Sequence, residues 1–390
     1  LDRRGCSRPG GGAMNPSTMG PSLDRTRGPV SDEVSPPATG APSEGLAQRT
    51  RSGEAGIECE DVDRAEIERL LGAIEILSET RYRFGDQRFD VRPGARPDDA
   101  MGSALVSDLA ARIYENAYAR SFDGSCREPA PSVPDAALIQ ELSTANATPD
   151  RWEAGWTHVG PSPDGGALVV RNGVQRSVPL ASIRSGADPS GGPSVLVRGL
   201  RESIDQQPGF YIAFGATWLA EESELDHVRF YWNLRGPRDG APWIRATTAR
   251  LNRFSVPFRL KCATAPDEFE RRDPAVLYVH RRFARLVARL LGDVHDSVAD
   301  GLDASVPLFT LRLRDGLGFA VDPGSGESFG MTRCRATAAA CLAAFRGSAT
   351  DFTSRIAELH AAFQRAGIDP SSPYRGLAPC PLSENESCSS

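Results

Sequence analysis

Apolar residues are distributed unevenly along the chain and are sparse over residues 1–56. Gly, Pro and Ser supply 24 of these 56 positions. A segment of this composition cannot bury enough apolar surface to offset the conformational entropy that it would lose on ordering. We therefore expect a disordered tail over residues 1–56 and a second loose segment over residues 379–390.

A helical spacing of apolar residues begins near Asp63 and predicts a first helix. The residues that follow this spacing are Ile67, Leu70, Leu71, Ile74 and Leu77. A second predicted helix contains Leu105, Leu109, Ile113 and Tyr114, and a third is predicted over residues 135–142. Residues 57–150 are therefore predicted to form a helical region.

From Trp152 onward the pattern changes to the alternation that is typical of strands. Asn172-Gly173 predicts the turn of a hairpin. Further strands are predicted over 194–200, 209–215, 227–234, 256–263, 275–280, 307–313 and 316–322, and helices over 241–252, 281–302 and 328–345. Because strands and helices follow no strict βαβ order, the pattern predicts an α+β fold. It consists of the N-terminal helical region followed, over 151–378, by a mixed, largely antiparallel sheet with packed helices.

Charge and motif content exclude several classes of protein. The net charge of -6 argues against a dedicated nucleic-acid-binding protein, and no apolar run approaches the roughly 18 residues that a membrane-spanning helix needs. No hydrophobic segment typical of a secretory signal stands near the start, and the eight cysteines form no CxxC pair. We expect a cytoplasmic protein that uses no metal or cofactor and binds neither nucleic acid nor a membrane.

The chain has 44 arginines but a single lysine, Lys261. This skew indicates GC-rich coding DNA, such as that of an actinomycete. Arginine is always charged, whereas lysine can act as a base where its surroundings favour the neutral amine. Alternation along the strand 256–263 places Lys261 on the same face as Arg259.

The predicted strand 227–234 also has one apolar and one polar face, and Arg229, Tyr231 and Asn233 share the polar face. Each strand taken alone is explained by a polar side that meets solvent. Together, the polar faces of the two strands carry Arg229, Tyr231, Asn233, Arg259 and Lys261. This combination favours a cationic site.

The glycine-rich loop at the start of the segment 322–335 opens a predicted helix. Backbone N–H groups at the positive end of a helix can hold an anion. Glu327 and Ser328 fall at the predicted N-terminus, and Arg333 and Arg335 follow, with guanidinium groups suited to phosphate. The spacing of a nucleotide-binding P-loop is absent. The alternative is an ordinary capped helix with surface arginines.

Arg271 and Arg272 precede the predicted strand 275–280, which presents Tyr278 and His280 on one face. Tyr278 can donate a proton or bind phosphate, although buried tyrosines often only anchor packing. His280 lies at the end of the strand, where a histidine is more often structural than catalytic.

Several blocks of the chain resemble the HopA-type effector family. They are GFYIAFG, VRFYWNL, LNRFSVPFRLKC, RRDPAVLYV, VPLFTLRL and GLGFAVDPGSGESFGMTRCR. The resemblance spans roughly residues 150–376. The family is named for a type III secreted effector of plant pathogens, and members in actinomycetes and cyanobacteria accompany gene clusters for peptide natural products.

The resemblance implies a lyase of lanthipeptide-type biosynthesis. In class V lanthipeptide and thioamitide pathways, an aminoglycoside-phosphotransferase-like kinase phosphorylates Ser or Thr of a precursor peptide. The HopA-like partner then eliminates phosphate and leaves dehydroalanine or dehydrobutyrine. The partners implied for this chain are therefore a phosphorylated precursor peptide and such a kinase.

By analogy with phosphothreonine lyases of another effector family, Lys261 is the expected base. Tyr278, Glu327 and His280 compete for the role of the acid, and Tyr278 and Glu327 are preferred because His280 lies at the end of its strand. The phosphate-binding residues implied are Arg229, Asn233, Arg272, Ser328, Arg333 and Arg335. Two alternatives remain, which are a non-catalytic module that binds a precursor peptide or the kinase, and a type III effector.

Overall fold

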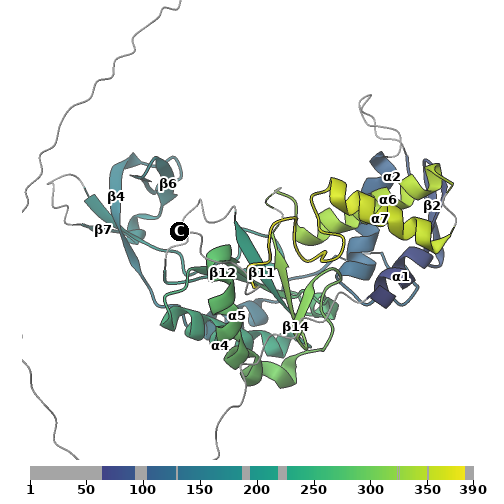
Figure 1. Ribbon diagram of the computed structural model, residues 1–390. Helices are drawn as coiled ribbons and strands as arrows, with labels where there is room; N and C mark the ends of the chain where they lie inside the picture. Colours follow the sequence, from purple (N-terminus) through teal and green to yellow (C-terminus); the bar gives the residue numbers. More distant parts are fainter. Residues whose placement is uncertain are drawn as a thin grey trace, which may run out of the picture. The chain divides into compact units, whose positions relative to one another are not determined.

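The computed structural model describes residues 64–92, 103–128, 131–186, 194–217, 226–322, 324, 326–348 and 351–382. All of them belong to one compact unit, Ala55–Ser390. The tail predicted over residues 1–56 lies outside the described residues, as does the predicted loose segment beyond residue 382. The described residues form helices and three antiparallel sheets, which confirms the α+β prediction (Figure 1).

The largest sheet has seven strands in the order β14-β15-β11-β13-β12-β10-β9. Their bounds are β9 Glu202–Ser203, β10 Phe210–Phe214, β11 His227–Trp232, β12 Phe258–Ala263, β13 Ala275–His280, β14 Leu311–Arg314 and β15 Leu317–Val321. Strands that are distant in sequence thus become neighbours. Each of the predicted strands over 209–322 is present in this sheet, although the one predicted over 307–313 begins only at Leu311.

One face of this sheet carries the first hydrophobic core. Phe230 of β11, Leu260 of β12 and Leu277 of β13 are fully buried there. The helices that contribute to this core are α3 (Ala136–Ala145), α4 (Pro237–Arg253) and α5 (Ala284–Val298). The apolar faces predicted for β11 and β12 are confirmed.

The opposite face is also covered, at least in part, by a second core. Tyr231 of β11 and Val276 of β13 are 2% and 1% exposed, and they pack in the same cluster as residues of other helices. These helices are α1 (Arg64–Gly72), α2 (Ser103–Ile113), α6 (Phe329–Arg346) and α7 (Phe352–Arg365). The alternative in which the polar face of β11 meets solvent is therefore wrong at Tyr231.

The helix predicted from Ile67 through Leu77 is wrong beyond Gly72, where α1 ends. A three-stranded sheet follows, with β1 (Ile74–Ser78), β2 (Arg81–Phe84) and β3 (Gln87–Asp90). In β1 the burial alternates, and Ile74 is 2% exposed while Leu77 is 39% exposed. Glycine disfavours helix continuation, and β-branched isoleucines suit a strand. The region predicted to be helical therefore also contains a sheet.

The second and third predicted helices are confirmed as α2 and α3. A π-helical turn, Tyr114–Tyr118, extends α2. Asp135 caps α3, because its side chain accepts hydrogen bonds from the N–H groups of Ala137 and Leu138.

A five-stranded sheet, which we call the small sheet, separates α3 from the seven-stranded sheet in sequence. Its order is β6-β5-β4-β8-β7, and its strands are β4 Trp152–Pro161, β5 Ala167–Arg171, β6 Val174–Val178, β7 Ile183–Ser185 and β8 Ser194–Arg198. Asn172 and Gly173 have φ values of 51° and 81°, so the predicted hairpin turn is confirmed. Trp156, Val169 and Val197 form a core of their own.

Candidate functional site

Three polar side chains lie in one row across the middle of the seven-stranded sheet. Arg259 of β12 pairs with Tyr278 of β13, and Tyr278 pairs in turn with Arg229 of β11. The row continues to Phe214 of β10 and Ala320 of β15. Residues that pair directly across a sheet project on the same side, so two arginines flank one tyrosine.

The ring of Tyr278 lies close to both guanidinium groups. Its centroid is 5.0 Å from Cζ of Arg259 and 5.3 Å from Cζ of Arg229. The imidazole of His227 meets the same ring edge-on, with centroids 5.5 Å apart. Cation–π contacts of this kind are worth about 0.5–2 kcal/mol, and they fix the plane of the tyrosine ring.

Lys261 lies on the same face, two residues from Arg259. It pairs with Ile212 of β10 and Val276 of β13. Its Nζ lies 4.0 Å from the centroid of the Phe210 ring, and the residue is half-buried. No ion pair joins Lys261 to another residue that the structure describes.

Asp322 lies at the end of this face that carries Arg229 and His227. Its Oδ2 accepts from Nε of Arg229 at 2.6 Å and lies 2.9 Å from Nε2 of His227. Its Oδ1 accepts from the N–H of Gly324 at 3.0 Å. Burial raises the pKa of this carboxyl, but the contacts with His227 and Arg229 outweigh burial and hold the pKa well below its usual value.

Arg229 is held in its charged form by the same contacts. Burial alone would lower its pKa, yet neighbouring tyrosines, Tyr231 and Tyr278 first, together with Asp322 raise it above the ordinary value. Arg229 is therefore a fixed, partly neutralised cation.

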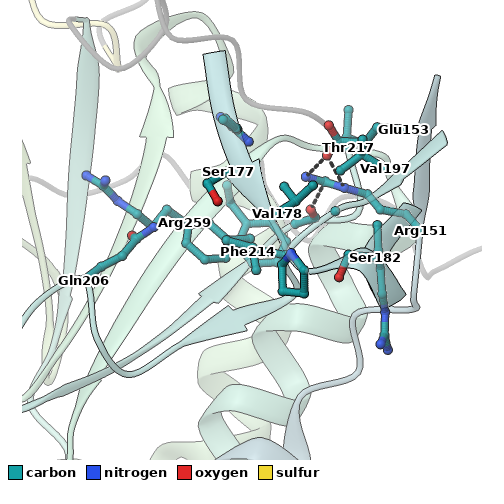
Figure 2. A pocket seen from close by; sticks show the side chains of 17 residues that line it. Arg151, Glu153, Ser177, Val178, Ser182, Val197, Gln206, Phe214, Thr217 and Arg259 are labelled. Carbon is teal, nitrogen blue, oxygen red and sulfur yellow. Dashed lines mark hydrogen bonds and ion pairs between the residues drawn. The ribbon is translucent and has the colours of Figure 1, made fainter. Parts of the chain in front are cut away.

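A cavity of about 500 Å³ adjoins the Arg259 end of the row (Figure 2). We call it the arginine pocket. One wall comes from the small sheet and the other from the ends of β10 and β12. Its charged lining residues are Arg151, Glu153, Arg176, Arg198 and Arg259. Arg151 contacts Glu153 at 2.9 Å, and Arg198 pairs with Asp150 at 2.8 Å. Arginines still outnumber carboxylates in the lining, and this excess of positive charge favours an anion.

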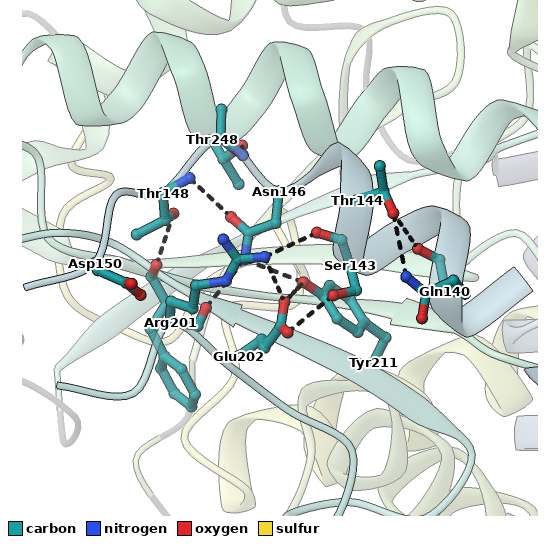
Figure 3. Close-up of polar contacts among 12 residues, drawn as sticks. Gln140, Ser143, Thr144, Asn146, Thr148, Asp150, Arg201, Glu202, Tyr211 and Thr248 are labelled. Carbon is teal, nitrogen blue, oxygen red and sulfur yellow. Dashed lines mark hydrogen bonds and ion pairs between the residues drawn. The ribbon is translucent and has the colours of Figure 1, made fainter. Parts of the chain in front are cut away.

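The wall of the arginine pocket is anchored by a polar network at the start of β9 (Figure 3). Glu202 accepts from the hydroxyl of Tyr211 at 2.7 Å and from Oγ of Ser143 at 2.9 Å. Asn146 donates to the same tyrosine oxygen and to the carbonyl of Arg201. Burial, and then the bond to Glu202, raise the pKa of Tyr211 far above its usual value, so its hydroxyl stays a donor.

Asn233 and Arg272 line a different cavity, of about 580 Å³. Asn233 donates to the carbonyl and hydroxyl oxygens of Ser305 at 2.9 and 3.0 Å. Arg272 forms a buried ion pair with Glu66 at 2.8 Å and donates to Ser121. Both predicted phosphate ligands therefore already have protein partners.

The predicted anion cradle at the start of α6 is a helix end that the side chain of Ser328 caps, and anion binding there stays a prediction. Ser328 accepts from the N–H of Met331 at 3.2 Å, which confirms its position as the N-cap. Glu327 accepts from Arg335 at 2.8 Å on the surface. Their charges neutralise each other, and the catalytic role of Glu327 stays a prediction.

Arg333 is 1% exposed and serves the interior. Its Nε donates to the carbonyl of Pro373 at 3.0 Å, and its guanidinium stacks 3.9 Å from the centroid of the Phe329 ring. Burial lowers its pKa to about 10. Its Nη1 has no hydrogen-bond partner among the described residues.

Of the predicted site residues, the fold thus brings Lys261, Tyr278 and Arg229 onto one face. Arg333, buried on α6, is near enough to Arg229 and Asp322 for their charges to affect its pKa. The other five lie elsewhere. Sequence reasoning missed His227 and the arginines of the small sheet. His227 stands two positions before Arg229 in the same strand, so the alternation of side chains predicts that both lie on one face. No comparable signal existed for the small sheet, because its contact with Arg259 is made only by tertiary folding.

Residues 202–375 match the model of the HopA1 effector protein family. This match confirms the resemblance to the HopA-type family over these residues. The match includes the whole row from Phe214 to Ala320, with Lys261 and Asp322. The family match is shorter than the resemblance over 150–376, since it begins at residue 202 and does not include the small sheet.

Two solved structures are similar to this chain. They are the effector proteins from Pseudomonas syringae pv. tomato strain DC3000 and pv. syringae strain 61. Identity is 16% and 14%, TM-scores are 0.40 for both, and each alignment covers 70% of this chain and 99% or 97% of the other. No curated protein matches the chain. Among the described residues, no helix is long and apolar enough to cross a membrane, and no cluster of side chains could hold a metal ion.

Proposed function

We propose that this chain is a phosphoserine/phosphothreonine lyase that eliminates phosphate from a phosphorylated peptide. One observation carries the proposal: the only lysine of the chain shares a sheet face with the row Arg259–Tyr278–Arg229. A base, a hydroxyl donor and fixed cations are the groups that such an elimination requires.

The proposed step balances without a cofactor. Nζ of Lys261 takes the proton from Cα, the electrons of that C–H bond form the Cα=Cβ bond, and the Cβ–O bond breaks. The phosphate leaves with that bonding pair, and the arginines neutralise its charge. The Tyr278 hydroxyl protonates the departing phosphate oxygen.

The substrate and its supply follow from the resemblance to the HopA-type family. The substrate would be a precursor peptide of lanthipeptide-type biosynthesis, phosphorylated in the cytoplasm by an aminoglycoside-phosphotransferase-like kinase. The products would be dehydroalanine or dehydrobutyrine.

The experiment compares wild-type protein with Lys261→Arg on a synthetic phosphothreonine peptide. Arginine keeps the charge but cannot accept a proton near neutral pH. We expect wild-type protein to release phosphoric acid, seen as the corresponding loss of peptide mass, and the variant to be slower by a factor of about 10²–10⁴. Undiminished elimination by Lys261→Arg would refute the assignment of the base.

Arg259→Lys is the matched control for charge on the same face. It keeps a cation two residues from Lys261 and should affect peptide affinity more than the elimination step. If the chain instead only binds a peptide or kinase, wild-type protein will eliminate nothing and Lys261→Arg will bind as well as wild type. The family description favours an effector role as the second candidate, and the same absence of elimination would leave it standing.

A further inference from the structure

The edge strand β6 borders the arginine pocket along its length. Arg176, Ser177 and Val178 are consecutive residues of β6, and all three line the cavity. Successive side chains of a strand point to opposite faces. The cavity also touches Glu153 of β4 and Val197 of β8, so it lies against one face of the small sheet and reaches the edge of β6.

This edge has backbone groups that the small sheet does not use. In the strand order, β6 has one neighbour, β5. The two-residue turn at Asn172-Gly173 makes Arg171 and Val174 a hydrogen-bonded pair. Hydrogen-bonded and non-hydrogen-bonded pairs alternate along two antiparallel strands. The residues between the hydrogen-bonded pairs are Gln175 and Ser177, so their N–H and C=O groups point away from β5. Among the described residues, none accepts a hydrogen bond from these two N–H groups.

We propose that β6 binds the phosphorylated peptide as an added antiparallel or parallel strand, which places its phosphate in the arginine pocket. This inference rests on the proposed function and names how the substrate is held. An added strand lies about 4.8 Å from its neighbour. Its backbone contacts are independent of sequence.

Charge selects the occupant. The pocket has more arginines than carboxylates in its lining, even though Arg151 contacts Glu153 and Arg198 pairs with Asp150. This excess of positive charge suits an extended peptide that carries a phosphate and disfavours a cationic one. Arg259 belongs both to this lining and to the row with Tyr278. A peptide strand on β6 therefore brings its phosphate toward the face that carries Lys261.

The small sheet precedes the family-matched residues 202–375. The structure thus divides the task between two parts of the chain. The seven-stranded sheet carries the proposed chemistry, and β6 carries the recognition of the peptide backbone.

The test uses synthetic phosphothreonine peptides that are N-methylated at one backbone position each, and it measures their dissociation constants for wild-type protein by fluorescence anisotropy. A strand pairs with its neighbour through every second residue. We expect methylation to weaken binding about tenfold at alternate positions and to have little effect between them. Equal effects at all positions would overturn the proposal.

A variant of the edge gives an independent measurement. Gln175→Pro removes an outward N–H group, whereas Gln175→Ala retains it. We expect the proline variant to bind the unmethylated phosphopeptide about tenfold more weakly than the alanine variant. Equal affinities would contradict the proposal. So would a dimer of the wild-type chain that Gln175→Pro converts to a monomer, because a second copy would then occupy the edge.

Elimination from N-acetyl-phosphothreonine methylamide, which is too short to add a strand, separates this inference from the proposed function. If neither the small compound nor the full phosphothreonine peptide is turned over but the alternating methylation pattern is found, the lyase proposal fails and the strand-binding edge stands. If turnover occurs and the pattern is absent, the edge proposal fails alone.

Discussion

Arg259 and Tyr278 face each other across β12 and β13, and the guanidinium carbon of Arg259 lies 5.0 Å from the centroid of the tyrosine ring. The same tyrosine has Arg229 on its other side, at 5.3 Å. A single ring thus separates a cation that lines the arginine pocket from a cation that is paired with Asp322. The spacing keeps both charges on one face without direct contact between them.

Substitution of Tyr278 should separate its packing from its hydroxyl. Tyr278→Phe keeps the ring between the two arginines, so the free energy of unfolding should change by less than about 1 kcal/mol. Tyr278→Ala should lose about 3 kcal/mol, because the side chain is 9% exposed. If the hydroxyl donates a proton, Tyr278→Phe should slow elimination by a factor of about 10² or more. Urea denaturation and rates of phosphate release measure the two effects, and a fully active Phe variant would remove Tyr278 from the acid role.

Asp322→Asn should destabilise the protein in a pH-dependent way. The variant leaves the buried charge of Arg229 without its carboxylate, at a cost of about 3 kcal/mol at pH 7. The pKa of Asp322 is lowered in the folded state, so its contribution is complete above the unfolded-state pKa of about 4 and is lost as the pH falls toward the folded-state value. The difference between wild type and variant in urea denaturation should therefore be larger at pH 7 than at pH 3. A difference that does not change with pH would contradict the ion pair.

Arg333→Lys should reduce stability and leave peptide binding intact. Lysine cannot reproduce both the bond to the Pro373 carbonyl and the stacking on Phe329. We expect a loss of about 2 kcal/mol in the free energy of unfolding, measured by urea denaturation. A specific loss of phosphopeptide affinity at unchanged stability would restore the phosphate-binding role that the sequence suggests.

Because Lys261 is the only lysine, an amine-reactive ester can label one side chain of the chain. Lys261 is half-buried over Phe210, so we expect slow labelling in the free protein. A bound phosphothreonine peptide should slow it further, by about tenfold, if the peptide covers this face. Peptide mass spectrometry separates this site from the N-terminal amine. The unphosphorylated peptide is the control, and equal protection by both would argue against a phosphate beside Lys261.

The local features of the fold could be predicted from the sequence because neighbouring residues determine them. The Asn172-Gly173 turn requires left-handed backbone at both positions, which these residues tolerate. Asp135 marks the start of α3 through its own side-chain bonds. Ile74 shows the limit of this approach, because its spacing from Ile67 suits a helix while its real partner is Phe84 on β2.

The site depends on strand order, which the sequence does not display. Tyr278 meets Arg229 and Arg259 only because β13 lies between β11 and β12. The sequence also does not show that Arg272 pairs with Glu66 and that Arg335 pairs with Glu327. These ion pairs decide whether each guanidinium group is available to a phosphate. The sequence shows which residues are cationic, but only the tertiary contacts show which of these cations face the candidate site.

The N–H of Gly199 donates to the carbonyl of Arg151 at 3.0 Å, directly outside the pair formed by Trp152 and Arg198. The chain therefore enters and leaves the small sheet at one point. A segment whose two ends meet can be exchanged as a cassette with little effect on the scaffold that carries it. Replacement of residues 152–198 would then be a route, in evolution or in protein engineering, to new peptide preferences on an unchanged chemical centre.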